Sequence, residues 1–134
     1  MNQPRRRAVN PPNVPAPIRG YYSNAVRVEP GPLLYIAGQV AIDMQGQLIG
    51  VGDAAAQCEQ ILKNIQGICE SQGATLADVI KVTVYVTDIS ILDKIAPVRL
   101  RYFPKDGPAS VLVEVSKLVE PDMLMEMEAV VAVP

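Results

Sequence analysis

The stretch that decides the fold is the end of the chain, Pro108–Pro134, which runs PASVLVEVSKLVEPDMLMEMEAVVAVP. Two runs within it, Ser110–Val115 and Met123–Val133, alternate in polarity with a period of two. This period is typical of strands that bury one face. We therefore expect two neighbouring strands, each with an aliphatic face directed at the core.

The two faces of these predicted strands differ in chemistry. The faces expected to be buried carry Val111, Val113 and Val115 in the first run, and Met123, Met125, Met127, Ala129 and Val131 in the second. The opposite faces carry Ser110, Leu112 and Glu114 in the first run, and Glu126 and Glu128 in the second. Charged residues are costly in a dry core, so we expect any chemistry on this second side.

Length and composition indicate one globular domain. The 134 residues are 49% hydrophobic and 19% charged, which is typical of a folded domain. No run approaches the roughly 20 apolar residues of a membrane span, and no apolar stretch follows Arg5–Arg7, so a secretory signal is not expected. These features predict a soluble, cytoplasmic protein that does not associate with membranes.

Several functional classes are disfavoured by what the chain lacks. It has no histidine, which excludes serine–histidine and cysteine–histidine catalysis and removes the commonest metal ligand. A net charge of −2 with one Phe and no Trp argues against a nucleic-acid surface, which needs basic patches and stacking aromatics. We expect no metal, no cofactor and no nucleic-acid partner.

The N-terminal part of the chain is divided by prolines. Residues 1–17 hold five of the twelve prolines and are predicted to form an extended or mobile arm before a domain at 18–134. For Arg5–Arg7 we favour a solvated tail over an anion contact. Two strand patterns, Ala25–Glu29 and Leu33–Val40, flank Pro-Gly-Pro, which predicts a hairpin. Gly38 inside a strand indicates a bulge, or the close approach of another group to the strand backbone.

Two helices are expected between the strands. The first begins at Asp53, runs to Ser71 and ends by Gly73, and its apolar stripe includes both cysteines, predicted to be buried thiols. A second helical segment begins at Asp88 or Ser90 and reaches Phe103, with an irregular turn or kink caused by Pro97. Between the helices, Val79–Thr87 is the clearest strand, rich in β-branched residues.

This order of elements predicts an α+β fold, a mixed sheet with two helices on one face. Two helices cannot cover both faces of the sheet. The uncovered face is expected to carry Arg27, Tyr35, Thr83, Tyr85, Leu112, Glu114, Glu126 and Glu128. Mixed apolar and charged faces of this kind are found at interfaces and pockets, so we expect subunits to associate through it.

Several collinear segments form a recognisable set, namely Gly20–Val26, Tyr35–Val40, Val82–Asp88, Pro108–Ser110 with Val113–Val115, and Met125–Ala129. Together these segments resemble the Rid (RidA/YjgF) family. The resemblance spans about residues 18–133. It implies a chorismate-mutase-like fold and a homotrimer whose sheets form a central barrel, with small-molecule sites in the clefts between subunits.

The resemblance also implies a chemistry and a set of site residues. Active members hydrolyse enamines and imines, such as 2-aminoacrylate and 2-iminopropanoate, to 2-keto acids and ammonia. Glu126 matches the glutamate that orients the attacking water, and so is the expected catalytic residue. The positions that match substrate-binding residues are Tyr22, Ala37, Gly38, Ser90, Ala109, Ser110 and Leu112.

One departure from the family changes the expected function. The arginine that holds the substrate carboxylate falls on Ser110, and a hydroxyl cannot make that two-pronged ion pair. Arg27 or Arg99 could replace it, although a solvated surface arginine is the simpler interpretation of each. We expect an imine deaminase-like hydrolase or tautomerase with an altered substrate, or else a non-catalytic ligand-binding or regulatory trimer. RNA cleavage and chorismate mutase activity are disfavoured.

Overall fold

A computed structural model describes residues 5–134; the first four residues of the predicted arm lie outside the described part. The elements in chain order are β1 Arg6–Val9, β2 Ala25–Val28, β3 Leu33–Gln39, α1 Ala54–Ser71, η1 Leu76–Asp78, β4 Val79–Val86, η2 Ile89–Ile91, α2 Leu92–Tyr102, β5 Ala109–Glu114 and β6 Met125–Ala132. Across residues 5–134, none of the helices has both the length and the apolar character to cross a membrane.

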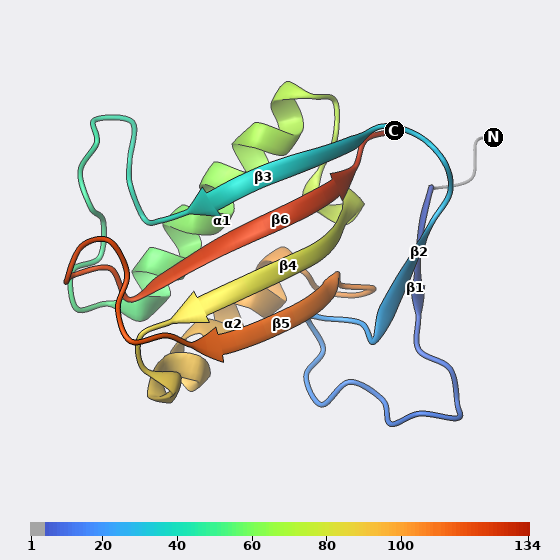
Figure 1. Cartoon of the computed structure of the whole chain (residues 1–134), viewed down its shortest axis with the longest axis horizontal. Coiled ribbons are helices and arrows are strands. Elements are labelled where there is room, and N and C mark those ends of the chain that lie inside the picture. The colour runs from blue at the N-terminus through green and yellow to red at the C-terminus, as the bar shows by residue number, and fades with distance from the viewer. Residues whose placement is uncertain (1–4) are drawn as a thin grey trace.

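The main sheet has four strands, and both helices pack on one of its faces (Figure 1). Its order is β3-β6-β4-β5, with β6 antiparallel to both neighbours and β5 parallel to β4. The predicted mixed sheet with two helices on one face is confirmed. The expected pairing of the two C-terminal strands is wrong, because β4 lies between them. The α2 crossover returns the chain parallel to β4, and β6 then pairs on the other side of β4.

The register of β5 reverses the predicted faces of that strand. Val82 pairs with Ser110 and Val84 with Leu112, and residues opposite one another in a ladder share a face. Ser110 and Leu112 therefore point toward the helices, and Leu112 packs against the core. The aliphatic residues predicted to be buried, Val111 and Val113, remain 44% and 40% exposed.

The predicted hairpin across Pro30–Pro32 does not form. Strand β2 pairs antiparallel with β1 in a separate two-stranded sheet, whereas β3 pairs with β6. This ribbon crosses beside one end of the main sheet in Figure 1. The Arg5 guanidinium donates to the carbonyls of Glu29, Pro32 and Val133, so backbone acceptors around the bend are satisfied without a hairpin. Arg27 lies in this ribbon and not on the open face of the main sheet, by which we mean the face that the two helices leave uncovered.

Both helices begin where the sequence indicates. Asp53 caps α1 by accepting from Ala56 N at 3.0 Å, as Asp and Ser side chains do at helix starts. The second helical segment begins with the single turn η2, capped by Asp88, and continues as α2 with Pro97 inside it. The segment does start with an irregular turn, but that turn lies at Ile89–Ile91 and not at Pro97, which is contained in the continuous helix α2.

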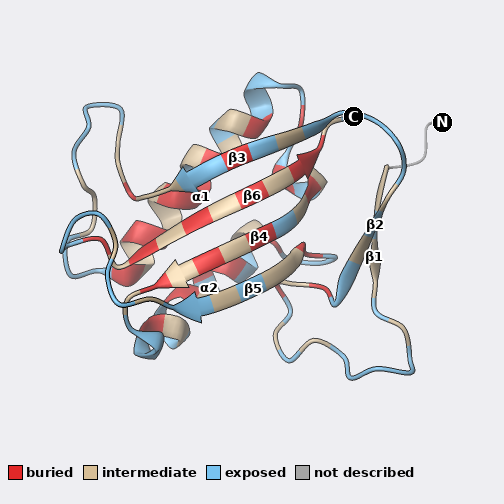
Figure 2. Ribbon diagram, viewed as in Figure 1, coloured by how far each residue is buried: buried red, intermediate tan, exposed pale blue. Residues whose placement is uncertain are grey.

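The core lies between the helices and the covered face of the sheet. Figure 2 shows buried residues alternating along β4 and β6 and gathered on the inner sides of α1 and α2. The inner stripe of α1 includes Cys58, Ile61, Leu62, Ile65 and Cys69, all fully buried. Both cysteines are free thiols, as predicted.

Burial should make both thiols unreactive in the folded protein. Desolvation raises the pKa of Cys58 to about 12 and that of Cys69 to about 11, so at pH 8 almost no thiolate is present. We expect negligible labelling by iodoacetamide at pH 8 and labelling of both cysteines in guanidinium chloride, measured by mass spectrometry. Rapid labelling of either thiol without denaturant would contradict the packing of α1 on the sheet.

Candidate functional site

The predicted site residues fall into two separate groups. We call Ala37, Gly38 and Glu126 the β3–β6 group, because they lie where those two strands meet. We call Tyr22, Ala109, Ser110 and Leu112 the β5 group, because they lie on β5 or on the segment beside it. Ser90 belongs to neither: it lies in the η2 turn, where its backbone N–H donates to the Asp88 carboxylate at 2.8 Å.

The β3–β6 group is built around a glycine in an irregular strand. The register between β3 and β6 shifts between Ile36 and Gln39, as in a β-bulge. A Cβ on residue 38 would lie 2.8 Å from Glu126 Oε2. Glycine therefore leaves the space that the Glu126 carboxylate occupies. Both signals predicted for this glycine, a bulge and a close approach, are confirmed.

The two glutamates of β6 have different surroundings on the open face. Tyr85 Oη donates to Glu128 Oε1 at 2.8 Å, and this bond raises the pKa of Tyr85. Glu128 is thus held in place by a structural partner. Glu126 makes no side-chain hydrogen bond or ion pair within residues 5–134, so its carboxylate is available to a ligand or a water molecule.

The open face is hollowed next to these residues. A cavity of about 540 Å³ is lined by Tyr35, Ala37, Lys81, Thr83 and Glu128, among others. Tyr35 is 75% exposed, which is unusual for a large aromatic side chain. This face therefore combines a largely apolar hollow that has a few polar groups with a large aromatic side chain in contact with water. Mixed faces of this kind are found at interfaces and pockets.

The β5 group adjoins a buried arginine that comes from α2. Arg99 Nη2 donates to Ser110 Oγ at 2.9 Å, and its guanidinium carbon lies 4.2 Å from the centroid of the Tyr21 ring. The residue is only 1% exposed. Burial lowers the pKa of Arg99, and the Tyr21 side chain opposes that shift. An arginine stays protonated in proteins, so this is a buried positive charge.

This charge has no carboxylate partner among the described residues. None of the ion pairs within residues 5–134 involves Arg99, and its Nε has no hydrogen-bond partner there. An ion removed from water costs several kcal/mol unless it is compensated. The Tyr21 ring and the Ser110 hydroxyl compensate part of this cost. The Nε–H is left without an acceptor within the described residues.

The surroundings of Arg27 and Arg99, the two candidates for a replacement arginine, differ. Arg27 is exposed on β2 and pairs with Glu29 at 3.1 Å, as expected for a surface arginine. For Arg99 the surface interpretation is wrong. The sequence placed it on the second helix, but its burial depends on how α2 packs beside β5.

Sequence reasoning selected Tyr22 and missed its neighbour. Tyr22 Oη accepts from Ile18 N at 3.1 Å, whereas the buried Tyr21 contacts the Arg99 guanidinium. Ser23 bridges to Ala109 and donates its N–H to Pro108 O at 3.0 Å. A Cβ on Gly107 would collide with the Tyr21 backbone. That glycine was the available signal that another segment passes close to the start of β5.

The two groups do not meet within one chain. Ser110 points to the helix side of the sheet and Glu126 to the open side, and β4 lies between their strands. Two strand spacings alone separate them by about 10 Å. A small ligand that touches both groups therefore needs the two halves from different copies of the chain. Within the described residues no group of three or more His, Cys, Asp or Glu is placed to hold a metal ion.

Comparison with known proteins agrees with this architecture. The family model described as endoribonuclease L-PSP matches residues 12–133. A RutC family protein of Pyrococcus horikoshii is 46% identical over 118 residues, covering 88% of this chain and 90% of the relative.

Two solved structures of the Rid family are also similar. YyfB of Yersinia pestis has a TM-score of 0.89 and 33% identity, with 96% of this chain and 98% of the other covered. RidA of a Psychrobacter species has a TM-score of 0.71 and 31% identity, with 94% and 98% covered. The chain therefore belongs to the Rid/YjgF family, the family that the endoribonuclease L-PSP model describes.

Proposed function

We propose that this protein hydrolyses small imines or enamines that carry a carboxylate, at sites shared between subunits. The observation that carries the proposal is the buried Arg99, which lacks a carboxylate partner in the described chain and is bonded to Ser110. Its charge lies behind the position where the family's substrate-binding arginine is expected. A cation at this place favours a substrate that keeps its carboxylate over a neutral one.

Arg99 would act on the ligand through Ser110. Because Ser110 Oγ accepts from Arg99 Nη2, the hydroxyl hydrogen is free to donate to an anion. A hydrogen bond polarised by a buried charge is stronger than a neutral one. Arg99 is therefore a positioning residue in this proposal, and Ser110 is the group that touches the substrate.

Glu126 would act as the general base on a water molecule. The carboxylate takes a proton from the water as its oxygen attacks the imine carbon, and it passes this proton to the nitrogen. The carbinolamine then transfers its hydroxyl proton to the nitrogen through the same carboxylate as the carbon–nitrogen bond breaks, giving the keto acid and ammonia. Gly38 supports this role, because its lack of a Cβ leaves room for the carboxylate at this place.

The shared site requires an oligomer, and we propose a homotrimer. The uncovered sheet face, with its exposed Tyr35, Val111 and Val113, is the surface through which copies would associate. A non-catalytic binding trimer is the alternative, favoured by the absence of an arginine on β5 itself. RNA cleavage has little support, since the chain has no histidine and a net charge of −2.

The assembly can be tested directly by mass. We expect light scattering after size exclusion to give three times the 14.5 kDa of one chain. Val113→Glu on the open face should lower this mass, because charges would be buried at the interface. Lys117→Glu, on the exposed loop after β5, is the control. A monomeric wild type would contradict both the trimer and the shared site.

The role of Arg99 is tested by removing its charge and then placing an arginine at position 110. Arg99→Gln should lower kcat/KM for freshly generated 2-iminopropanoate by about 10- to 100-fold, as expected for loss of a charge-assisted contact. The double variant Arg99→Gln/Ser110→Arg should recover much of this loss. Arg101→Gln, which removes an exposed arginine paired with Glu59, should change little.

Folding and binding must be measured on the same variants. Thermal unfolding separates loss of activity from loss of structure, and a purely structural Arg99 would not be rescued by an arginine at position 110. Unchanged kcat/KM in Arg99→Gln would overturn the proposed role of Arg99. A wild type that binds 2-keto acids without turning over the imine would support the non-catalytic trimer instead.

Gly38 offers a test of the other half of the site. Gly38→Ala places a Cβ at 2.8 Å from Glu126 Oε2, so the carboxylate must move and kcat should fall by about tenfold or more. Gly67→Ala is the matched control: a Cβ there meets nothing within 4 Å, and helix propensity predicts a gain of up to about 1 kcal/mol in stability. Equal kcat in wild type and Gly38→Ala would contradict the placement of Glu126.

A further inference from the structure

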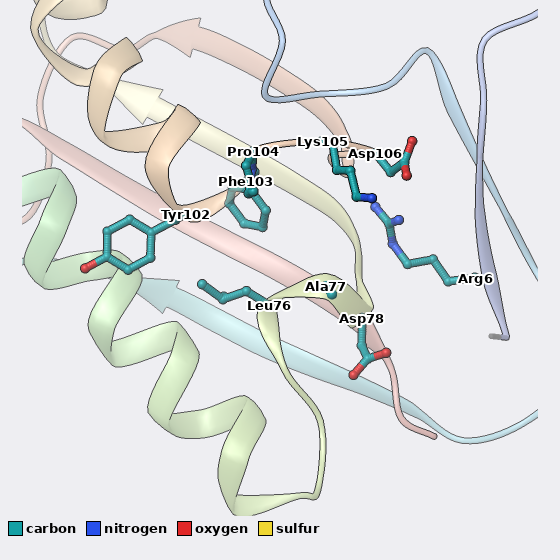
Figure 3. Close-up of a pocket in the computed structure, with 9 residues that line it drawn as sticks. All are labelled: Arg6, Leu76, Ala77, Asp78, Tyr102, Phe103, Pro104, Lys105 and Asp106. Carbon is teal, nitrogen blue, oxygen red and sulfur yellow. The ribbon is translucent and has the colours of Figure 1, made fainter.

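A second cavity lies on the helix side of the molecule, and its lining shares no residue with either group of site residues. It has a volume of about 460 Å³ and lies between β1, the η1 turn and the loop after α2 (Figure 3). Its lining includes Arg6, Leu76, Asp78, Phe103, Lys105 and Asp106. Neither the proposed reaction nor the resemblance to the family uses these residues.

The floor of this cavity is apolar. Leu76 and Phe103 are 7% and 4% exposed, and they hold their places as members of the core. The Tyr102 hydroxyl is directed away, since it donates to Glu59 Oε1 at 3.2 Å. Only the ring of Tyr102 therefore contributes to the lining. The floor can accept a small aliphatic or aromatic group.

The rim carries two charges of each sign. Arg6 Nε donates to Val79 O at 2.8 Å, which fixes the guanidinium at the cavity, and Figure 3 shows Arg6 reaching from β1 toward the loop with Lys105 and Asp106. Desolvation lowers the pKa of Arg6, and the charges of Asp106 and Asp78 oppose that shift. Neither carboxylate forms an ion pair with Arg6 within the described chain.

The arrangement of charges limits the class of ligand. A simple anion would meet the carboxylates of Asp78 and Asp106, and a simple cation would meet Arg6 and Lys105. A neutral apolar molecule would contact the floor but pair with none of the four charges of the rim. A zwitterion with a short spacing between its charges can satisfy both signs, and an attached apolar group would lie on Leu76 and Phe103.

We propose that this cavity binds a free α-amino acid with an apolar side chain. Its carboxylate pairs with the Nη atoms of Arg6, since a guanidinium matches a carboxylate in planar geometry. Its ammonium lies by Asp106, with Asp78 nearby, although one oxygen of Asp78 already accepts from Thr75 N at 2.9 Å. Because Arg6 comes from β1, binding would also fasten the N-terminal ribbon to the helix layer.

The ligand class is tested with three probes that differ by one charge. Isothermal titration of the full chain with L-leucine, N-acetyl-L-leucine and L-leucinamide should show binding of L-leucine alone. Equal binding of the acetylated compound would indicate an anion site, and equal binding of the amide a cation site. Either result, or no heat from any probe, would overturn the proposal.

The location is tested with variants of the rim. Arg6→Gln and Asp106→Asn should each weaken L-leucine binding by about tenfold or more. Asparagine tolerates the positive φ of 51° at position 106, so that change removes charge without backbone strain. Arg7→Gln, next to Arg6 on β1 but exposed, is the control and should bind like wild type. Full binding by both rim variants would place the amino acid elsewhere and overturn the assignment.

Discussion

The pairing of β5 with β4 is the constraint on which the rest of the structure depends. The α2 crossover makes this pairing parallel, and the register Val82 with Ser110 and Val84 with Leu112 follows along it. That register directs Ser110 to the helix side, where α2 supplies Arg99. It also leaves β6 to pair on the other edge of β4, which directs Glu126 to the open face. The separation of the two halves of the site is thus a property of the sheet order.

The buried charge of Arg99 is an energetically costly feature of the fold. Within the described residues it has an aromatic ring and one hydroxyl as partners, where a buried guanidinium usually has a carboxylate. The Nε–H of this guanidinium has no acceptor in the described chain, so part of the desolvation cost is not compensated there. The hydrogen bond from Arg99 Nη2 to Ser110 Oγ brings a charge from α2 to the start of β5.

The N-terminal ribbon, formed by β1 and β2, has side chains that bond to other parts of the molecule. Arg5 and Arg6 do not project as a free basic tail: Arg5 bonds to carbonyls around the bend, and Arg6 bonds to Val79 O. These contacts place a guanidinium beside two carboxylates and an apolar floor. The outer edge of β3 is left without a partner strand in the described chain, so the ribbon and that edge are both available to a neighbouring molecule.

The sequence by itself determined the family and most of the elements, although not the strand β1. Helical periodicity with Asp53 as a cap located α1, β-branched alternation located β4, and Gly38 indicated a bulge, because these are local signals. Only the tertiary structure decided which strands are neighbours, on which face of the sheet Ser110 lies, and with which strand β2 pairs. Strand alternation fixes which residues share a face but not which face meets the helices. In the same way, Arg99 at the end of a helix can be solvated or buried, and the packing of Tyr21 and β5 around it decides that it is buried.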